Sequence, residues 1–217
     1  YQDNDGEIWV ATYGGGLNKY NPASNSFTSY RLNQNEKNGI NSFKIHNVFD
    51  DGEGRLWIST NGGGINVFTK STGVFKQYLH TSAVGSLPSN STYTIFKDSK
   101  NKIWIATEAG LALYNADKDN FATFTTENGL PNNVIFGILE DDNYNLWIST
   151  GKGISRFNIN ETGFKNFRII DGIQSYEFKE NAFCKSSNGV FYFGGVNGFN
   201  AFNPDKIKYS TYTSPLA

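Results

Sequence analysis

Short apolar runs recur along the whole chain, and turns rich in glycine, asparagine and aspartate separate them. One run has a fixed pattern, in which a tryptophan lies between apolar residues and is followed by a small residue and threonine. Its central aromatic residue recurs every 43 to 48 residues, and all four tryptophans of the chain occupy it. This period predicts a repeat architecture, and runs of this length predict strands. Four full copies and one degenerate copy are present: Glu7–Thr12, Arg55–Thr60, Lys102–Thr107, Asn145–Thr150 and Val190–Gly195.

The residues around each tryptophan run complete a unit of four strands. A turn of Asp, Asn and Gly precedes the run, and a glycine-bearing turn and a second apolar run follow it. A third turn leads to an aromatic strand such as Phe75–Tyr78, and a β-prone run such as Lys44–Phe49 precedes the next Asp turn. Four antiparallel strands per unit, with no sustained helical period, predict an all-β fold, the β-propeller of four-stranded antiparallel blades. The expected units cover about residues 1–30, 43–78, 92–124, 134–167 and 180–207.

The chain is expected to form about five blades of one propeller region, residues 1–207, followed by a linker toward a further domain at residues 208–217. Tyr1–Asp3 resembles the end of a first strand, so the sequence is expected to begin inside a blade. Common propellers have more blades than this, and we expect the later part of a larger propeller. A closed five-bladed ring is the alternative, in which residues 208–212 supply a missing strand.

The glycines Gly14–Gly16 and Gly62–Gly64 could belong to a phosphate-binding loop or to a tight turn. No Lys-Ser/Thr pair follows them, as a P-loop requires, and no helix follows to offer its N-terminus to a phosphate. Fewer glycines serve at the same place in other units, as in Ala109–Gly110 and Lys152–Gly153. A hairpin turn is therefore the better interpretation.

Composition excludes several classes of function. The formal net charge is −1 and no basic run is present, which argues against nucleic-acid binding. The apolar runs are too short to cross a membrane, so we expect no membrane contact by this part of the protein. The single cysteine, Cys184, cannot form an internal disulfide.

Candidates for catalysis and metal binding are few. The two histidines, His46 and His80, occupy different places in the repeat, so a catalytic pair is not expected. Asp3–Gly6 begins like a calcium loop but lacks the glutamate that completes one, and a hairpin turn is favoured. The sequence therefore predicts no catalytic residue, no metal and no cofactor. The tryptophans and the Phe/Tyr pairs could form sugar-stacking platforms, but their strict recurrence on strands favours a core between blades.

These motifs together resemble the two-component regulator propeller repeat. The motifs are D-x-x-G, L/I-W-I-x-T, G-G-G-L/I-N-x-Y/F, N-P or T-G, and F-x-x-Y, and they recur over residues 5–30, 52–78, 98–124 and 142–167. Residues 172–178 and 192–207 resemble the closing blade, although Tyr192 replaces tryptophan there.

The resemblance implies the extracytoplasmic sensor region of a hybrid two-component histidine kinase. It implies seven-bladed propellers, two per sensor, and an immunoglobulin-like domain that leads to an inner-membrane anchor. It also implies a periplasmic location, a homodimeric receptor, and a polysaccharide-derived oligosaccharide as the signal. The kinase, receiver and DNA-binding parts are expected to lie beyond this chain.

Recognition residues are expected where the repeats differ, on the loops of one propeller face. These loops carry amides, aromatic rings and charged groups, which suit sugar hydroxyls and ring faces, although some of the asparagines could simply cap turns. The expected ligand-binding residues are Tyr13, Asn61, Glu108, Lys152, Asn41, His46, Asn90, Tyr93, Asn133 and Tyr176. A protein-interaction scaffold is the second hypothesis, and an enzyme similar to the streptogramin lyases is the third.

Overall fold

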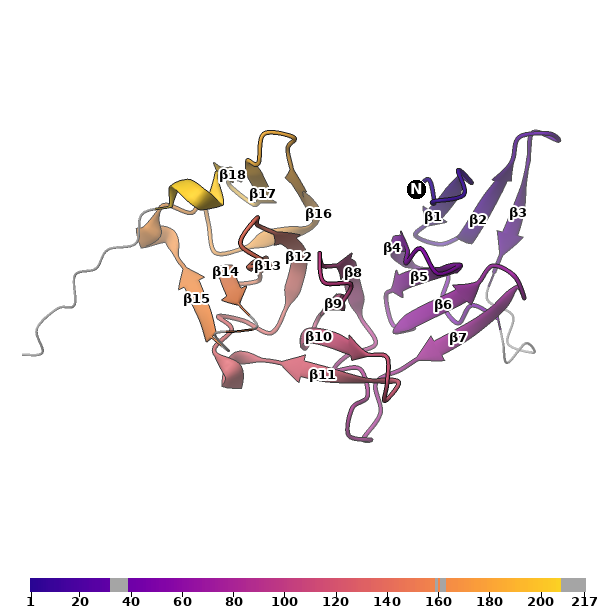
Figure 1. Cartoon of the computed structure of the whole chain (residues 1–217), viewed down its shortest axis with the longest axis horizontal. Helices are drawn as coiled ribbons and strands as arrows, with labels where there is room; N and C mark the ends of the chain where they lie inside the picture. The colour runs from indigo at the N-terminus through magenta and orange to yellow at the C-terminus, as the bar shows by residue number, and fades with distance from the viewer. Residues whose placement is uncertain (32–38, 159, 161–162, 208–217) are drawn as a thin grey trace, which may run out of the picture.

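The computed structural model describes residues 1–31, 39–158, 160 and 163–207, and the expected linker at 208–217 lies outside the described residues. Within them, eighteen strands form five antiparallel sheets that follow one another along an open arc (Figure 1). The first and last sheets lie at opposite ends of the arc. The all-β propeller architecture predicted from the repeats is confirmed.

Each sheet is one blade, and blades 1 to 5 are numbered in chain order. Blade 1 contains β1 (Trp9–Thr12), β2 (Gly16–Asn21) and β3 (Ser26–Tyr30). Blade 2 contains four strands, β4 (Ile45–Asp50), β5 (Arg55–Thr60), β6 (Ile65–Thr69) and β7 (Val74–Tyr78). Blade 3 contains β8 (Thr92–Lys97), β9 (Ile103–Thr107), β10 (Gly110–Asn115) and β11 (Asn120–Phe124). Blade 4 contains β12 (Ile135–Glu140), β13 (Leu146–Thr150), β14 (Gly153–Asn158) and β15 (Gly163–Phe167). Blade 5 contains β16 (Phe178–Lys185), β17 (Phe191–Gly195) and β18 (Gly198–Phe202).

The inner strands β4, β8, β12 and β16 lie side by side along the inside of the arc, and β7, β11 and β15 lie at its rim (Figure 1). Blade 1 has a remnant of an inner strand, because Gln2 bridges Ile8 in antiparallel fashion. This bridge places Gln2 beside the tryptophan strand, where the other blades have an inner strand. In blade 5, no fourth strand lies among the described residues.

Each tryptophan is anchored by an aspartate six residues before it. The indole Nε1 of Trp104 donates to Oδ2 of Asp98 at 2.8 Å, while Oδ1 of Asp98 accepts the backbone N–H groups of Lys100 and Lys102. One carboxylate therefore shapes the turn and fixes the buried ring. The same indole bond occurs in the pairs Asp3–Trp9, Asp51–Trp57 and Asp141–Trp147.

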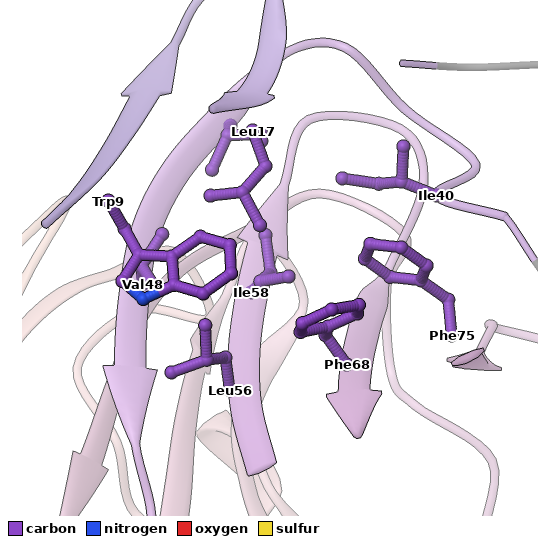
Figure 2. Packing of buried hydrophobic residues seen from close by; sticks show 9 residues of the cluster. Trp9, Leu17, Ile40, Val48, Leu56, Ile58, Phe68 and Phe75 are labelled. Atoms are coloured by element: carbon purple, nitrogen blue, oxygen red, sulfur yellow. The ribbon is translucent and has the colours of Figure 1, made fainter. Parts of the chain in front are cut away.

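The tryptophans lie between blades. Each of the four rings is only 1% exposed. Each contacts an aromatic residue of its own outer strand and another on the third strand of the next blade, as Trp104 contacts Phe124 and Phe157. Figure 2 shows the first of these cores, in which Trp9 of blade 1 lies against Leu56, Ile58 and Phe68 of blade 2. The interpretation of the aromatic residues as an interblade core is confirmed.

Blade 1 has one apolar face that no other blade covers among the described residues. Val10 and Phe27 are 39% and 55% exposed, whereas the equivalent residues of blade 2, Ile58 and Phe75, are 0% and 5% exposed. In blade 2 the tryptophan of the preceding blade lies against these positions. The open end of the arc therefore carries the complementary half of an interblade core.

The glycine turns confirm the structural interpretation of the triple glycines. Gly64 has a φ of 62°, and its N–H donates to the carbonyl of Asn90 at 2.8 Å. Its own carbonyl accepts the hydroxyls of Thr60 and Thr92. A Cβ at Gly64 would lie 2.1 Å from the carbonyl oxygen of Tyr78, so only glycine fits there.

A pair of alanine variants separates this close approach from the cost of positive φ. Gly62 has a φ of 82°, and no atom lies within 4 Å of the Cβ it would acquire. We expect Gly62→Ala to lower the free energy of unfolding by about 1–2 kcal/mol, the cost of a left-handed conformation. Gly64→Ala should cost about 1–3 kcal/mol more because of the clash. Urea denaturation measures both values, and equal losses would show that the Tyr78 carbonyl moves away freely.

Candidate functional site

Two sets of loops lie together on one face, which we call the loop face. One set contains the turns after the tryptophan strands, and the other contains the connections between blades. Backbone hydrogen bonds join the sets, as from Gly14 to the Phe43 carbonyl and from Gly153 to the Tyr176 carbonyl. The face expected to hold the recognition residues is therefore a continuous surface.

A register shift near the start of each inner strand sets particular side chains apart. Pairing with the tryptophan strand shifts between Ile45 and Asn47, between Thr92 and Ile95, and between Ile135 and Gly137. Such bulges re-aim side chains and are common beside functional sites. In these three strands the residue that directly follows Ile45, Thr92 or Ile135 lies in the irregularity. These residues are His46, Tyr93 and Phe136.

These residues form a column of rings across successive blades. The rings of Tyr13 and His46 are stacked with centroids 5.9 Å apart and an interplanar angle of 6°. His46 and Tyr93 are stacked at 5.3 Å and 3°, and Tyr93 contacts Phe136 at 5.5 Å. One ring from each of blades 1 to 4 therefore lines the inside of the arc.

Blade 5 reaches this column through a longer irregularity. In β16 the register shifts between Phe178 and Phe183, and Asn181 has a φ of 56°. The carboxylate Oε2 of Glu180 lies 3.7 Å from Nδ1 of His46. Nδ1 also lies 3.1 Å from the carbonyl of Thr92, which can only accept, so Nδ1 carries the proton.

Two acidic residues lie near the centre of the column. Burial raises the pKa of Tyr93, and the negative charges of Glu108 and Glu180 raise it further. We call Tyr13, His46, Tyr93, Phe136, Glu108 and Glu180 the inner-rim cluster. Its rings with two carboxylates can offer apolar faces and hydrogen-bond acceptors to a polar ligand.

A second group lines a depression on the loop face of blade 4. Lys152 and Tyr176 line a cavity of about 490 Å³ together with Pro131, Asn166 and Arg168. We call these five residues the blade-4 depression. The structure therefore brings together two of the residues predicted from sequence and adds a second cation.

Three of the predicted asparagines hold loops in place. The Oδ1 atom of Asn90 accepts the N–H of His80 at 2.7 Å, and Oδ1 of Asn133 accepts the N–H of Thr126 at 2.8 Å. Asn41 exchanges hydrogen bonds with the buried Asn66. Asn90 and Asn133 thus bind backbone N–H groups earlier in their own connections, whereas Asn41 binds a side chain on β6. Asn61 contributes a backbone N–H to the carbonyl of Lys44.

Five residues of these two groups were not predicted from sequence, namely Phe136, Glu180, Arg168, Pro131 and Asn166. Phe136 had a signal, because it aligns with His46 and Tyr93 when the units are superposed. No sequence pattern indicates Glu180, because the irregularity of β16 has no counterpart of equal length in blades 2 to 4. Arg168 lies just after an aromatic strand, where no rule of the repeat draws attention to it.

The two histidines are separate, as expected from sequence. His80 Nδ1 lies 2.7 Å from the carbonyl of Leu87, in the connection between blades 2 and 3. His46 has the different partners described above. Among the described residues, therefore, no contact joins the two histidines.

An acidic group on the opposite face is occupied by a lysine. Asp3, Asp5 and Asp50 bring their carboxylates within 4.8 Å of one another, as metal ligands would. The ammonium of Lys70 lies among them at 2.9, 2.7 and 2.7 Å. Burial alone would raise the pKa of Asp3 and of Asp50, but hydrogen bonds from Lys70 hold both below their usual value. We call Asp3, Asp5, Asp50 and Lys70 the Lys70 cluster, in which one ammonium offsets part of the negative charge of the three carboxylates.

Comparison with known families identifies the repeats. Residues 86–109 and 129–152 match the family of the two component regulator propeller. Two segments of the chain therefore match the two-component regulator propeller repeat. Both matched segments run from the connection before an inner strand, through the tryptophan strand, to the turn on the loop face.

Solved structures show the same fold around these repeats. The extracellular domain of a protein classified as a hybrid two-component system of B. thetaiotaomicron is 28% identical over 94% of this chain, with a TM-score of 0.68. A second such domain from that organism is 22% identical over 98% of this chain, with a TM-score of 0.80. This chain covers only 33% and 31% of those two proteins.

A more distant enzyme shares the architecture. An inactive variant of virginiamycin B lyase from Staphylococcus aureus, solved with quinupristin, is 15% identical over the whole of this chain, with a TM-score of 0.69. This chain covers 69% of that protein, and the likeness shows the fold alone. No curated protein matches the chain.

The described part of the chain consists of strands, turns and three short 3-10 helices. It contains no helix with the length and apolar character needed to cross a bilayer.

Proposed function

We propose that the chain is part of the ligand-sensing propeller of a hybrid two-component sensor histidine kinase. The observation that carries this proposal is the match to the two component regulator propeller, joined to the 28% identity with an extracellular domain of a hybrid two-component system. In the proposed receptor these blades are a non-enzymatic recognition module. The signal passes to the kinase and then to transcription.

The proposed ligand is an oligosaccharide released from a polysaccharide. Its support is the chemistry of the loop face, where Tyr13 and Tyr176 are 62% and 48% exposed and lie among charged and amide groups. Aromatic faces and hydrogen-bonding side chains on a rigid frame suit sugar rings and hydroxyls.

The rest of the proposed receptor follows from the family. The blades belong to a seven-bladed propeller that is completed by further blades against the open apolar face of blade 1. A second propeller and an immunoglobulin-like domain in the same chain connect it to an inner-membrane anchor. The receptor is a homodimer with its sensor region in the periplasm.

Alanine variants on the loop face test the ligand site. Tyr13→Ala, Glu108→Ala and Tyr176→Ala should each weaken binding of the recognised oligosaccharide about tenfold or more, as loss of a central aromatic or charged contact does. A panel of plant and host oligosaccharides is screened first by thermal unfolding, because a ligand at 100 times its Kd stabilises the fold by about 2.7 kcal/mol. Titration calorimetry then gives each Kd.

Tyr144→Ala is the matched control, since Tyr144 is exposed in the turn between β12 and β13, on the face opposite the loop face. Undiminished binding in all three loop-face variants would exclude this set of residues as the site. No thermal shift with any sugar would count against the oligosaccharide.

A protein-interaction role is the second candidate, and one loop favours it. The short 3-10 helix Ile169–Asp171 exposes Ile170 by 86%. The equivalent helix one blade earlier, Thr126–Asn128, has threonine and glutamate at the matching positions. An apolar tip where the repeat is otherwise polar is typical of a contact with another protein surface.

A further inference from the structure

We propose that the blade-4 depression binds the anionic group of an acidic saccharide, a uronate carboxylate or a sulfate ester. This inference rests on the proposed oligosaccharide-sensing function and names the class of sugar. Two cations and a tyrosine line one hollow of about 490 Å³, and no carboxylate lines it.

The two cations have no internal counter-charge. Among the described residues, neither Lys152 nor Arg168 forms an ion pair, whereas Lys70, Lys76 and Lys185 each pair with an aspartate. The nearest acid along the chain, Asp171, uses Oδ2 to accept the backbone N–H of Arg168 at 2.8 Å. Two positive charges that share one hollow repel each other, and an anion between them would relieve that repulsion.

The backbone beneath the depression is held in position. The N–H of Lys152 donates to Oγ1 of Thr150 at 3.0 Å, and the carbonyl of Tyr176 accepts the N–H of Gly153. Asn166 donates to the carbonyl of Gly129 and accepts the hydroxyl of Ser155. A ligand therefore needs to order only the ends of the side chains, which reduces the entropic cost of binding.

The lining suits a charged sugar better than a small inorganic anion. The planar guanidinium of Arg168 can bind two oxygens of a carboxylate or sulfate, while Lys152 acts as a point charge. The exposed ring of Tyr176 and the ring of Pro131 offer apolar surface to the C–H face of a pyranose. The volume lies within the range of small-molecule sites.

The inner-rim cluster differs in charge, which limits where an acidic sugar can lie. Glu108 and Glu180 lie near Tyr93 there, so an anionic group is repelled from that part of the loop face. The acidic sugar unit of the ligand therefore binds in the blade-4 depression, and its neutral sugar units extend toward the inner-rim cluster.

The test uses titration calorimetry with probes in matched pairs. One arm compares oligogalacturonates with neutral galacto-oligosaccharides of equal length, and the other compares a sulfated chondroitin disaccharide with its unsulfated form. We expect at least one acidic probe to bind at least tenfold more tightly than its neutral partner, and more weakly as salt rises. The arm that responds identifies the anionic group.

The variant for this test is Lys152→Gln with Arg168→Gln. It should weaken acidic-probe binding about tenfold or more and remove the preference for the acidic probe over its neutral partner. Lys100→Gln with Lys118→Gln is the charge-matched control, because both lysines are exposed in turns on the opposite face. Circular dichroism and the melting temperature establish that both variants fold.

The outcomes separate this inference from the proposed function. Binding of a neutral sugar with no preference for its acidic partner, unchanged in the double variant, would overturn the acidic-ligand inference and leave the sensing function standing. Equal binding of poly-glutamate would also overturn it, by reducing the site to a general attraction for anions. Failure of every sugar to bind would contradict both.

Discussion

Replacing Trp104 with alanine is expected to lower the free energy of unfolding by about 3–5 kcal/mol, the loss typical of a large buried aromatic residue. The ring is 1% exposed and contacts Phe124 of its own blade and Phe157 of blade 4. Its removal leaves a cavity between two sheets that cannot close without moving one blade against the other. Urea denaturation followed by circular dichroism measures the loss.

Trp104→Phe divides this loss into packing and hydrogen bonding. Phenylalanine keeps most of the aromatic surface but cannot donate to Asp98, whose Oδ2 accepts only this indole among the described residues. The buried carboxylate oxygen then lacks a partner, which costs about 1–3 kcal/mol. Asp98→Asn in the Trp104→Phe background should recover part of that cost. A full 3–5 kcal/mol loss in Trp104→Phe alone would show that the indole bond outweighs packing.

Replacing Lys70 with methionine is expected to be comparably destabilising at neutral pH, by about 3–5 kcal/mol, because it leaves buried charges without a partner. The side chains of Asp3 and Asp50 are 0% and 1% exposed, and Lys70 bonds to both. Methionine has a similar length and removes only the charge. Lys100→Met is the matched control, since Lys100 is exposed and lies over the ring of Tyr144, and its loss should stay within about 0.5 kcal/mol.

The pH dependence of this difference has a defined sign. The pKa values of Asp3 and Asp50 are lowered in the folded protein, so their stabilising contribution is present above the ordinary carboxyl pKa and is lost as the pH falls through the folded values. The three carboxylates raise the pKa of Lys70 although burial opposes it, so the lysine stays charged through the neutral range. The gap between the parent protein and Lys70→Met should therefore be constant from about pH 6 to 9 and narrow below about pH 4. A gap that did not narrow in acid would show that lost packing, not unpaired charge, causes the instability.

The repeat made the architecture predictable because each unit carries its own markers. The tryptophan position, the Asp turn and the glycine turn fixed the four strands of blades 2 to 4. The bond from Trp104 to Asp98 was not predicted, although the spacing of six residues is the same in four blades. A turn by itself accounts for an aspartate at this position, so the sequence pattern does not reveal its second role as acceptor for the indole.

The sequence predicts which face of the propeller carries the candidate site, but not which residues of that face form it. Repetition places loops on one side, but it does not say which loop side chains bond to the backbone. Asn90 and Asn133 prove to hold turns, whereas Lys152 and Tyr176 share a depression. The contact between His46 and Glu180 joins blades 2 and 5, so it depends on the curvature of the whole arc rather than on any local pattern.

Each tryptophan lies at the border with the next blade, so the repeat seen in the sequence is not the unit that folds cooperatively. The cooperative unit is the core between two neighbouring blades. The core that begins at Trp104 is completed by Ile148 and Phe157, which belong to the next repeat. A single repeat excised at its turns would thus divide two cores and possess neither. Mutational effects should couple across neighbouring repeats and be nearly independent for repeats further apart, as in a linear array with nearest-neighbour interactions. Insertion or loss of whole repeats during evolution preserves this arrangement, because every new border regains one tryptophan and one receiving face.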